Sequence, residues 1–328
     1  MKRTLLLICT LLCANVLLAQ EQLAVLRHND STSVFYGTSA FEQAYTAATH
    51  GDIITLSDGI FTTPSSIRKG ITVRGNGACA DTARRSIGTY FMEDFNVSQL
   101  GDSLQFSAEG IYFDDFEDDN APCKIKLSKC IIRLLRDIDN AEITNCIIKS
   151  GHIWGTATKR ITIMNSVIRT WVFSSSGGIY TIPVFADCRN SIIIGKGDYA
   201  ETYTQYSNCI IINKSTTDTI VDNKTNNSVL IGWDSTSHMA STENVFMSLS
   251  DVFENWDGET ISYDPETYRL KSSVSDSIQG LDGTEVGIFG GFMPFDWRPS
   301  YSIIKRFNVA NRTTADGKLS VDIEVISE

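Results

Sequence analysis

The chain has 328 residues, of which 20% are charged, and its formal net charge at pH 7 is −11. An acidic surface repels the phosphates of nucleic acid, so we expect no nucleic-acid partner. An acidic ligand of any kind would need a local basic patch or a bridging cation.

The N-terminus has the pattern of a secretory signal peptide over residues 1–19. Lys2 and Arg3 precede an apolar run from Leu5 to Leu12, and Ala19 supplies a small residue at the expected cleavage site. The apolar run is too short for a membrane span, and no later segment approaches 18 apolar residues. We therefore expect an exported protein of formal charge −13, located in the periplasm, on the cell surface or outside the cell.

The mature chain should open with a short lead-in segment at 20–36 and then a helix. Ser39 and Glu42 match a capping box, and Gly51 is expected to stop the helix. The apolar residues that fall on one helical face are Phe41, Ala44, Tyr45 and Ala48. Such a helix could cover the open end of a stack of strands.

A tetrad of residues recurs through the middle of the chain. Five copies begin with Asn, and a looser copy begins with Lys. They are Lys129-Cys130-Ile131-Ile132, Asn145-Cys146-Ile147-Ile148, Asn165-Ser166-Val167-Ile168, Asn190-Ser191-Ile192-Ile193, Asn208-Cys209-Ile210-Ile211 and Asn227-Ser228-Val229-Leu230, spaced by 16, 20, 25, 18 and 19 residues. A repeat near 20 residues that is rich in β-branched residues predicts coils of strands stacked on one another. Asn tolerates the left-handed backbone conformation, so each Asn is predicted to form a turn.

Six cysteines follow the predicted leader, and three of them share one position of the repeat. Cys and Ser interchange at that position, which predicts a column of small inward residues with free thiols, where Cys acts as an apolar filler. Cys79 and Cys123 are the pair that we would test first for a disulfide bond.

The repeat fades after about residue 240. Residues 264–291 are predicted to form turns and closing coils, and two alternating runs at 303–309 and 319–325 predict a hairpin that caps the far end. The predicted organisation is a signal peptide at 1–19, a lead-in segment at 20–36, a coil domain at 37–291 and a β-hairpin tail at 292–328.

Three stretches carry a resemblance to a known family. They are the predicted helix with the strand 52–56, the second coil around 69–75, and the closing pattern from Asp264 to Gly290. Here the chain resembles the pectin-lyase-like proteins, in particular their uncharacterised exported bacterial members. Among the characterised members of that family, the chain best resembles lyases that act on alginate or chondroitin. The resemblance implies an all-β fold: a single-stranded, right-handed parallel β-helix with an N-terminal capping helix and a C-terminal β cap.

The catalytic signatures of two branches of that family are missing. Asp114-Asp115 and Gly151-His152-Ile153 are only fragments of the pattern found in polygalacturonase-like hydrolases, and the Arg-x-Pro-x-x-Arg of pectate lyases is absent. The alginate and chondroitin lyases use a Lys and an Arg on neighbouring coils, which leaves that chemistry open.

A column of cations is predicted one residue past the tetrads. The positions are Arg133, Lys149 and Arg169, followed by Ile194, Ile212 and Ile231 in later coils. Adjacent strands lie about 4.8 Å apart, so these cations should stack, and stacked like charges are normally avoided. Arg136 and His152 share a second position, three residues further on. The column predicts a site for the carboxylates or sulfates of a polysaccharide.

Three interpretations of this column stay open. In a lyase, Lys149 or His152 would be the base, and Arg133 and Arg169 would neutralise the substrate carboxylate. Without catalysis, the cations would bind a glycan. In both cases Trp154 and Trp171 would stack on sugar rings, and Arg136 would join the binding residues. Alternatively, the cations pair with nearby acids on a solvated face. The candidate acids are Asp137, Asp139 and Glu142.

An acidic cluster precedes the column. Asp114, Asp115, Glu117 and Asp118 offer hard oxygen ligands that could hold Ca²⁺, although the cluster lacks the spacing and Gly of a known calcium loop. A hydrated acidic turn is the alternative, and we expect no cofactor other than such a Ca²⁺ ion.

The sequence as a whole favours an exported cell-envelope protein that interacts with a polysaccharide or glycan without catalysis. A polysaccharide lyase that acts by β-elimination on uronate-containing glycans is the first alternative, and a structural or adhesive module is the second. The sequence leaves the oligomeric state open.

Overall fold

A computed structural model describes most of the chain outside the N-terminus. The described residues are 22–80, 87–119, 123–138, 140–153, 159–169, 171–173, 184–194, 203–212, 225–232, 243–258, 260–298, 303–309, 318 and 321–326. The predicted signal peptide at 1–19 lies outside them. Among the residues described, no helix has both the length and the apolar character needed to cross a bilayer.

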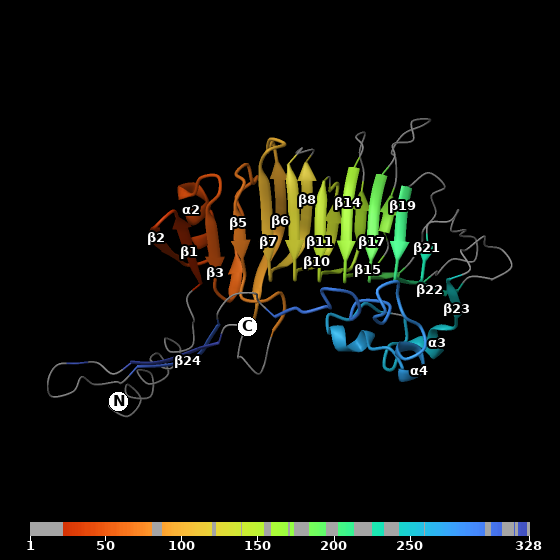
Figure 1. The fold of residues 1–328 in the computed structure, drawn as a ribbon. Helices are drawn as coiled ribbons and strands as arrows, with labels where there is room; N and C mark the ends of the chain where they lie inside the picture. Colours follow the sequence, from red (N-terminus) through yellow and green to blue (C-terminus); the bar gives the residue numbers. More distant parts are fainter. Residues whose placement is uncertain are drawn as a thin grey trace, which may run out of the picture.

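Two long sheets form the body of the molecule (Figure 1). The first sheet has the strand order β2 (Ser31–Tyr36), β1 (Leu23–His28), β3 (Ile53–Leu56), β5 (Thr72–Arg74), β7 (Gln105–Glu109), β9 (Lys124–Ser128), β11 (Ala141–Thr144), β14 (Lys159–Met164), β17 (Val184–Arg189), β19 (Tyr203–Ser207) and β21 (Thr225–Asn226). The second sheet has the order β23 (Val245–Met247), β22 (Val229–Ile231), β20 (Ile210–Ile212), β18 (Ile192–Ile194), β15 (Val167–Arg169), β12 (Ile147–Ile148), β10 (Ile131–Arg136), β8 (Tyr112–Asp119), β6 (Thr89–Ser98) and β4 (Gly59–Phe61), with β13 (Gly151–Ile153) beside β10 and β16 (Trp171–Phe173).

The chain alternates between these sheets, and from β3 onward each strand pairs in parallel with the strand one turn later. This arrangement is a parallel β-solenoid, so the predicted stack of coils is confirmed.

The tetrads lie where the chain passes from the first sheet to the second. All five Asn residues have the predicted left-handed backbone, with φ between 46° at Asn227 and 56° at Asn208, and Lys129 shares it at 55°. The two aliphatic residues that end each tetrad then face opposite sides. Ile148, for example, joins the interior of the solenoid, while Ile147 joins a second apolar cluster outside it. The tetrads are continuously apolar because both faces are covered.

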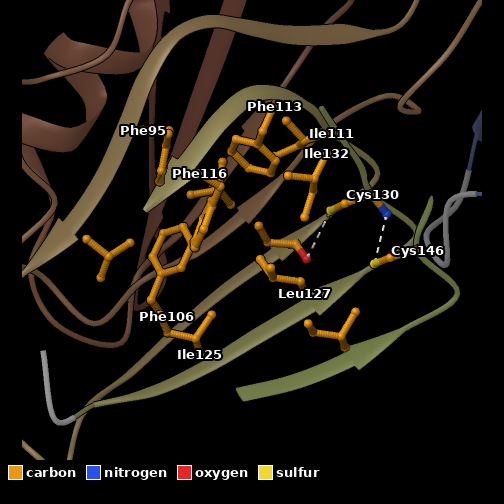
Figure 2. Close-up of a cluster of buried hydrophobic side chains, with 14 of the residues drawn as sticks. Phe95, Phe106, Ile111, Phe113, Phe116, Ile125, Leu127, Cys130, Ile132 and Cys146 are labelled. Atoms are coloured by element: carbon orange, nitrogen blue, oxygen red, sulfur yellow. Dashed lines mark hydrogen bonds between the residues drawn. The ribbon is translucent and has the colours of Figure 1, made fainter. Parts of the chain in front are cut away.

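Inside the solenoid, the Cys/Ser position forms a hydrogen-bonded ladder. The backbone N–H of Ser166 donates to Ser191 Oγ at 3.2 Å, and that hydroxyl donates to the carbonyl of Arg189 at 2.7 Å. Cys146 repeats the pattern with sulfur, since its Sγ accepts from the N–H of Cys130 at 3.5 Å (Figure 2). The same Sγ donates to the carbonyl of Thr144 at 3.3 Å. The column of small inward residues is confirmed, but its members are hydrogen-bonding groups and not simply apolar fillers.

None of the six described cysteines forms a disulfide bond. The free-thiol prediction is therefore confirmed, and Cys79 and Cys123, the pair to test first, are not bonded to each other. Burial raises the pKa of Cys209 to about 12, so this thiol is unreactive at neutral pH.

An aromatic cluster fills the first turns of the solenoid. Its rings come from α2 (Ala40–Ala47) and from β6, β7 and β8, and Figure 2 shows several of them facing one another across the interior. The fully buried rings are Phe41, Phe91, Phe95, Phe106, Phe113 and Phe116.

Helix α2 packs against the start of the first sheet. It begins after Ser39 as expected, but Ser39 makes no side-chain capping bond, and the Glu42 carboxylate accepts instead from Thr62 Oγ1 at 2.9 Å. The predicted capping box is therefore wrong. The lead-in segment forms β1 and β2, an antiparallel hairpin that adds to the edge of β3.

Residues 249–258 and 260–298, here called the C-terminal segment, fold back along one side of the solenoid (Figure 1). The segment contains α3 (Leu249–Val252), the 3₁₀ helix η1 (Pro265–Tyr268) and α4 (Ser272–Ser275). Residues 264–291 were expected to form closing coils, but the last strand of the parallel stack is β23. Asn165 Nδ2 ties the segment to the solenoid by donating to the carbonyls of Ile288 at 2.9 Å and Gly290 at 2.7 Å.

The predicted C-terminal hairpin is present as β24 (Ile303–Val309) and β25 (Val321–Ile326), which pair antiparallel. Figure 1 places β24 toward the end of the solenoid that holds β1, away from β23. The hairpin therefore does not cap the far end.

Candidate functional site

The second sheet brings the predicted cation positions into one column. Ile132 pairs with Ile148, and Ile148 pairs with Ile168, so the residues that follow them occupy equivalent positions on three consecutive turns. The N–H of Lys149 donates to the carbonyl of Ile132 at 2.9 Å, which continues the register past the tetrad. We call Arg133, Lys149 and Arg169 the cation column.

The C-terminal segment explains why the column changes from cations to isoleucines. Ile194 pairs directly with Arg169, and Ile212 and Ile231 continue the same position. These three isoleucines are at most 4% exposed, because they pack in one cluster with Phe253, Trp256 and Tyr268 of the segment. Lys149 is exposed, and Arg133 and Arg169 are partly exposed. This position is therefore isoleucine on the turns that the C-terminal segment covers, and a cation on the turns where the side chain reaches solvent.

Arg169 lies at the border of this cover, beside Tyr268. Burial raises the pKa of Tyr268 above its usual value, and Tyr263 adds a small increase. A hydrogen bond with Ser262 and the positive charge of Arg169 offset part of this rise. The Tyr268 hydroxyl donates to the carbonyl of Ser262 at 3.0 Å, so it is held in place and is not a free ligand group.

The two arginines of β10 are paired with acids of β8. Arg133 forms a two-point contact with Asp114, with Nε–Oδ1 at 2.6 Å and Nη2–Oδ2 at 3.0 Å. Arg136 contacts Asp115 at 2.8 Å and Glu117 at 3.0 Å. The hydrogen bonds from Arg133 hold the pKa of Asp114 below its usual value, against a smaller opposing effect of burial.

These pairs differ from those expected for a solvated face. We named Asp137, Asp139 and Glu142 as candidate partners because they are close in sequence. Glu142 instead binds Lys126 at 2.7 Å on the first sheet, and Asp139 lies outside the described residues. In a solenoid, the neighbour of a surface residue is one turn away in the chain, so acids about 20 residues earlier reach Arg133 and Arg136.

The Asp114–Arg133 pair gives a testable pH dependence. Because the pKa of Asp114 is lowered by folding, its contribution to stability is present above the unfolded pKa of about 4 and is lost as pH falls through the folded pKa. We expect Asp114→Asn to destabilise the protein by about 1 kcal/mol at neutral pH. The variant should also lose less stability than the wild type between about pH 5 and about pH 3, as measured by urea unfolding.

The matched control is Asp102→Asn, which changes an exposed carboxylate outside the strands. It should leave both the stability and its pH profile unchanged. An identical profile for the wild type and Asp114→Asn would contradict the assigned pair.

The acidic cluster is engaged in the fold. Asp115 is 8% exposed and Asp118 is fully buried, while Asp114, Asp115 and Glu117 contact arginines. Across the described part of the chain, no group of three or more His, Cys, Asp or Glu side chains has an arrangement that could hold a metal ion. The Ca²⁺ site at Asp114, Asp115, Glu117 and Asp118 stays a prediction.

The other predicted site residues lie on the neighbouring turns. His152 pairs with Arg136 on one side and with Val172 on the other, and Trp171 pairs with Gly151. Trp154 and the side chains of His152 and Trp171 lie outside what the structure describes. The backbone therefore brings His152 beside the cation column without showing where its ring points.

Sequence reasoning missed two tyrosines next to Arg133. Tyr112 and Tyr263 form an edge-to-face pair with ring centroids 6.4 Å apart, and Tyr263 comes from the C-terminal segment. Burial, then Tyr263 and Asp114, raise the pKa of Tyr112 to about 12, an effect that Arg133 partly offsets. No signal in the sequence places residue 263 beside residue 112, because the contact depends on how the segment folds back.

Beneath the segment is a small cavity of about 10 Å³, lined by Lys129, Ile131, Ile147, Phe295 and Trp297 among others. This volume holds about one water molecule, so the cavity cannot hold a sugar. A ligand of the cation column would therefore bind on the open surface.

The fold and the column define the class of the protein as a parallel β-solenoid with a charged lateral face. Comparisons with protein-family models, with curated proteins and with solved structures found no match.

Proposed function

We propose that this chain is an exported cell-envelope protein that binds an anionic glycan at Lys149 and Arg169 without catalysing its cleavage. One observation carries the proposal. The three positions of the cation column are in register, and among the described residues only Arg133 has a carboxylate partner. Lys149 and Arg169 thus present unneutralised charge on a chain whose net charge is negative.

The surroundings of the column favour a glycan over other anions. The surface is open and flanked by tyrosines, and sugar rings pack well on aromatic faces. A dense polyanion such as nucleic acid would also meet the exposed Glu93 and Asp94 of β6, which repel it. Widely spaced carboxylates on a neutral backbone avoid this repulsion.

The pairing of the arginines favours binding over lyase chemistry. β-Elimination requires a free cation at the substrate carboxylate and a base near the neighbouring C–H group. Arg133 and Arg136 are already bound to acids, which leaves Arg169 as the neutralising group and Lys149 or His152 as the base in a lyase. A polysaccharide lyase is therefore the second candidate.

The family resemblance supports two finer features of the proposal. The opening stretch at 37–61 and the closing pattern at 264–291 resemble pectin-lyase-like proteins, and we infer a right-handed coil on that basis. Crossovers between parallel strands are right-handed in nearly all proteins, which agrees with this inference. We also infer that α2 caps the first turn, since Phe41 and Ala44 are fully buried in the core.

The test uses the chain from residue 20 onward with alginate, chondroitin, heparin and pectin. We expect retention of one or more of these glycans, and Lys149→Ala and Arg169→Ala should each weaken it about tenfold, equivalent to the loss of one charge-assisted contact. Lys124→Ala is the matched control, because Lys124 is an exposed cation of the first sheet.

The ultraviolet absorbance of a new unsaturated bond is followed in the same samples. A rise that Lys149→Ala abolishes would replace the binding proposal with the lyase. Absence of retention on every glycan, or equal retention by all variants, would overturn the proposed site.

A further inference from the structure

The edge strands at the four ends of the solenoid sheets differ in length. In the first sheet, β2 has six residues and β21 has two. In the second sheet, β4 and β23 have three residues each. Short edge strands are one way in which proteins prevent a sheet from pairing with another chain. Among these four ends, β2 is therefore the long edge, and Figure 1 places it at the end of the molecule.

Strand β2 also lacks the other features that protect an edge. The stretch Ser31–Tyr36 contains no proline and no charged residue, and its register with β1 is continuous, without a bulge. Val34 is 43% exposed and Tyr36 is 58% exposed. Edge strands that must stay unpaired usually carry a charge, a proline or a bulge. The composition of β2 is instead that of a strand that accepts a further strand.

The backbone groups on the outer side of β2 follow from its pairing with β1. The N–H of Gly37 donates to the carbonyl of Gln22 at 2.9 Å. Residues of an antiparallel pair alternate between hydrogen-bonded and non-hydrogen-bonded positions. Counting back from Gly37, the residues whose N–H and C=O groups point away from β1 are Thr32, Val34 and Tyr36. No described residue pairs with these groups.

A two-fold axis just outside β2, perpendicular to the first sheet, would bring the β2 of a second copy alongside in antiparallel orientation. The two bodies then lie on opposite sides of the axis and do not overlap. The axis keeps each residue on its own face of the sheet, so Val34 lies opposite Val34 of the second copy, and Thr32 lies opposite Tyr36. Each such pair can exchange both of its hydrogen bonds, which uses all the outward backbone groups of the strand.

We propose that β2 binds the β2 of a second copy, so that the first sheets of two chains join across a two-fold axis. A two-fold interface uses the same patch on both copies, so the patch must complement itself. Strand β2 does so in its backbone groups. Its outer face also pairs valine with valine and threonine with tyrosine, and such β-branched and aromatic pairs stabilise antiparallel strands.

The surroundings of β2 carry little charge, although the chain as a whole has a net charge of −11. Two copies repel one another where charged surfaces meet. Helix α2 lies beside β2 and would approach α2 of the second copy, and its exposed residues Gln43, Thr46 and Ala47 are uncharged. Asp30, the acid that precedes β2, is separated from its two-fold equivalent by the length of the paired strands. This end of the molecule therefore brings no like charges into contact.

The dimer is tested with the chain from residue 20 onward, by light scattering coupled to gel filtration at several protein concentrations. We expect a dimer at about 0.05 M salt that tightens at about 1 M salt, because salt screens the repulsion between the bodies. Val34→Lys should weaken the dimer at least tenfold, since two introduced lysines would lie opposite one another. Ile60→Lys is the matched control. It makes the same kind of change on β4, where Ile60 is 54% exposed, and should have no effect.

A mixture of Val34→Lys and Val34→Glu tests whether Val34 lies opposite itself. Each variant alone would place like charges at the axis, whereas in the mixed dimer the introduced lysine of one chain faces the introduced glutamate of the other. We expect the mixture to form dimers at concentrations at which each variant alone is monomeric. Circular dichroism verifies that the variants remain folded.

Four results would overturn the proposal: a wild-type monomer at every concentration, a dimer that dissociates at high salt, Val34→Lys that dimerises as well as Ile60→Lys, or a mixture no better than its components. The interface uses neither Lys149 nor Arg169, so Val34→Lys should bind glycans as the wild type does. The dimer and the proposed glycan site are therefore tested independently.

Discussion

Phe95→Ala should lower the free energy of unfolding by about 3–5 kcal/mol, the range found when a buried aromatic ring is removed from a packed core. Phe95 is fully buried on β6. Its ring lies 5.0 Å from that of Phe91, 5.0 Å from that of Phe113 and 5.5 Å from that of Phe106, measured between ring centroids. These rings come from β6, β7 and β8, so the deletion would open a cavity where successive turns meet. Urea unfolding measures the effect.

Phe292→Ala is the matched control for this deletion. The chemical change is the same, but Phe292 is 99% exposed, so removing its ring leaves no cavity. We expect its free energy of unfolding to stay within about 0.5 kcal/mol of the wild-type value. Similar losses for both variants would mean that the aromatic cluster is not the core of the first turns.

The tetrads made most of the solenoid predictable because they combine two physical requirements. Asn190 and its equivalents supply the left-handed corner, and the β-branched pair that follows supplies a strand. The recurrence of the tetrad sets the register even though its spacing varies from 16 to 25 residues, so the sequence alone places Arg133, Lys149 and Arg169 in one column.

Contacts between distant segments could not be predicted in the same way. The double coverage of each aliphatic pair follows from a C-terminal segment that lies on the outer face of the second sheet. That segment has no repeat, and its attachment depends on particular bonds such as Asn165 to the carbonyl of Ile288. The hairpin of β1 and β2 was missed because the short alternation around Asn29 was read as a lead-in segment.

The chemical state of the candidate site was only partly predictable. Sequence spacing located the cations, but the acids that neutralise Arg133 and Arg136 come from the turn before. The acidic cluster and the cation column are separate features of the sequence, but β8 and β10 are neighbours in the sheet. Because the acids of β8 pair with Arg133, the charge that is available to a ligand is on Lys149 and Arg169.

Ser191 is a buried member of the Cys/Ser ladder, and its removal should have a large effect on stability. Its side chain is fully buried, accepts from the N–H of Ser166 at 3.2 Å and donates to the carbonyl of Arg189 at 2.7 Å. Alanine would remove both bonds and leave the N–H of Ser166 without its acceptor inside the solenoid. We expect Ser191→Ala to lower the free energy of unfolding by about 1–3 kcal/mol, as measured by urea unfolding.

Ser191→Cys tests whether the loss in stability comes from the hydrogen bonds or from the volume of the side chain. A thiol already fills the equivalent position at Cys146, where its sulfur accepts from an N–H at 3.5 Å and donates to a carbonyl at 3.3 Å. The cysteine variant should therefore lose about 1 kcal/mol or less, since weaker bonds of the same geometry remain. If alanine and cysteine destabilise the protein equally, the ladder contributes nothing through hydrogen bonding, and the interchange of Cys and Ser along the column reflects size alone.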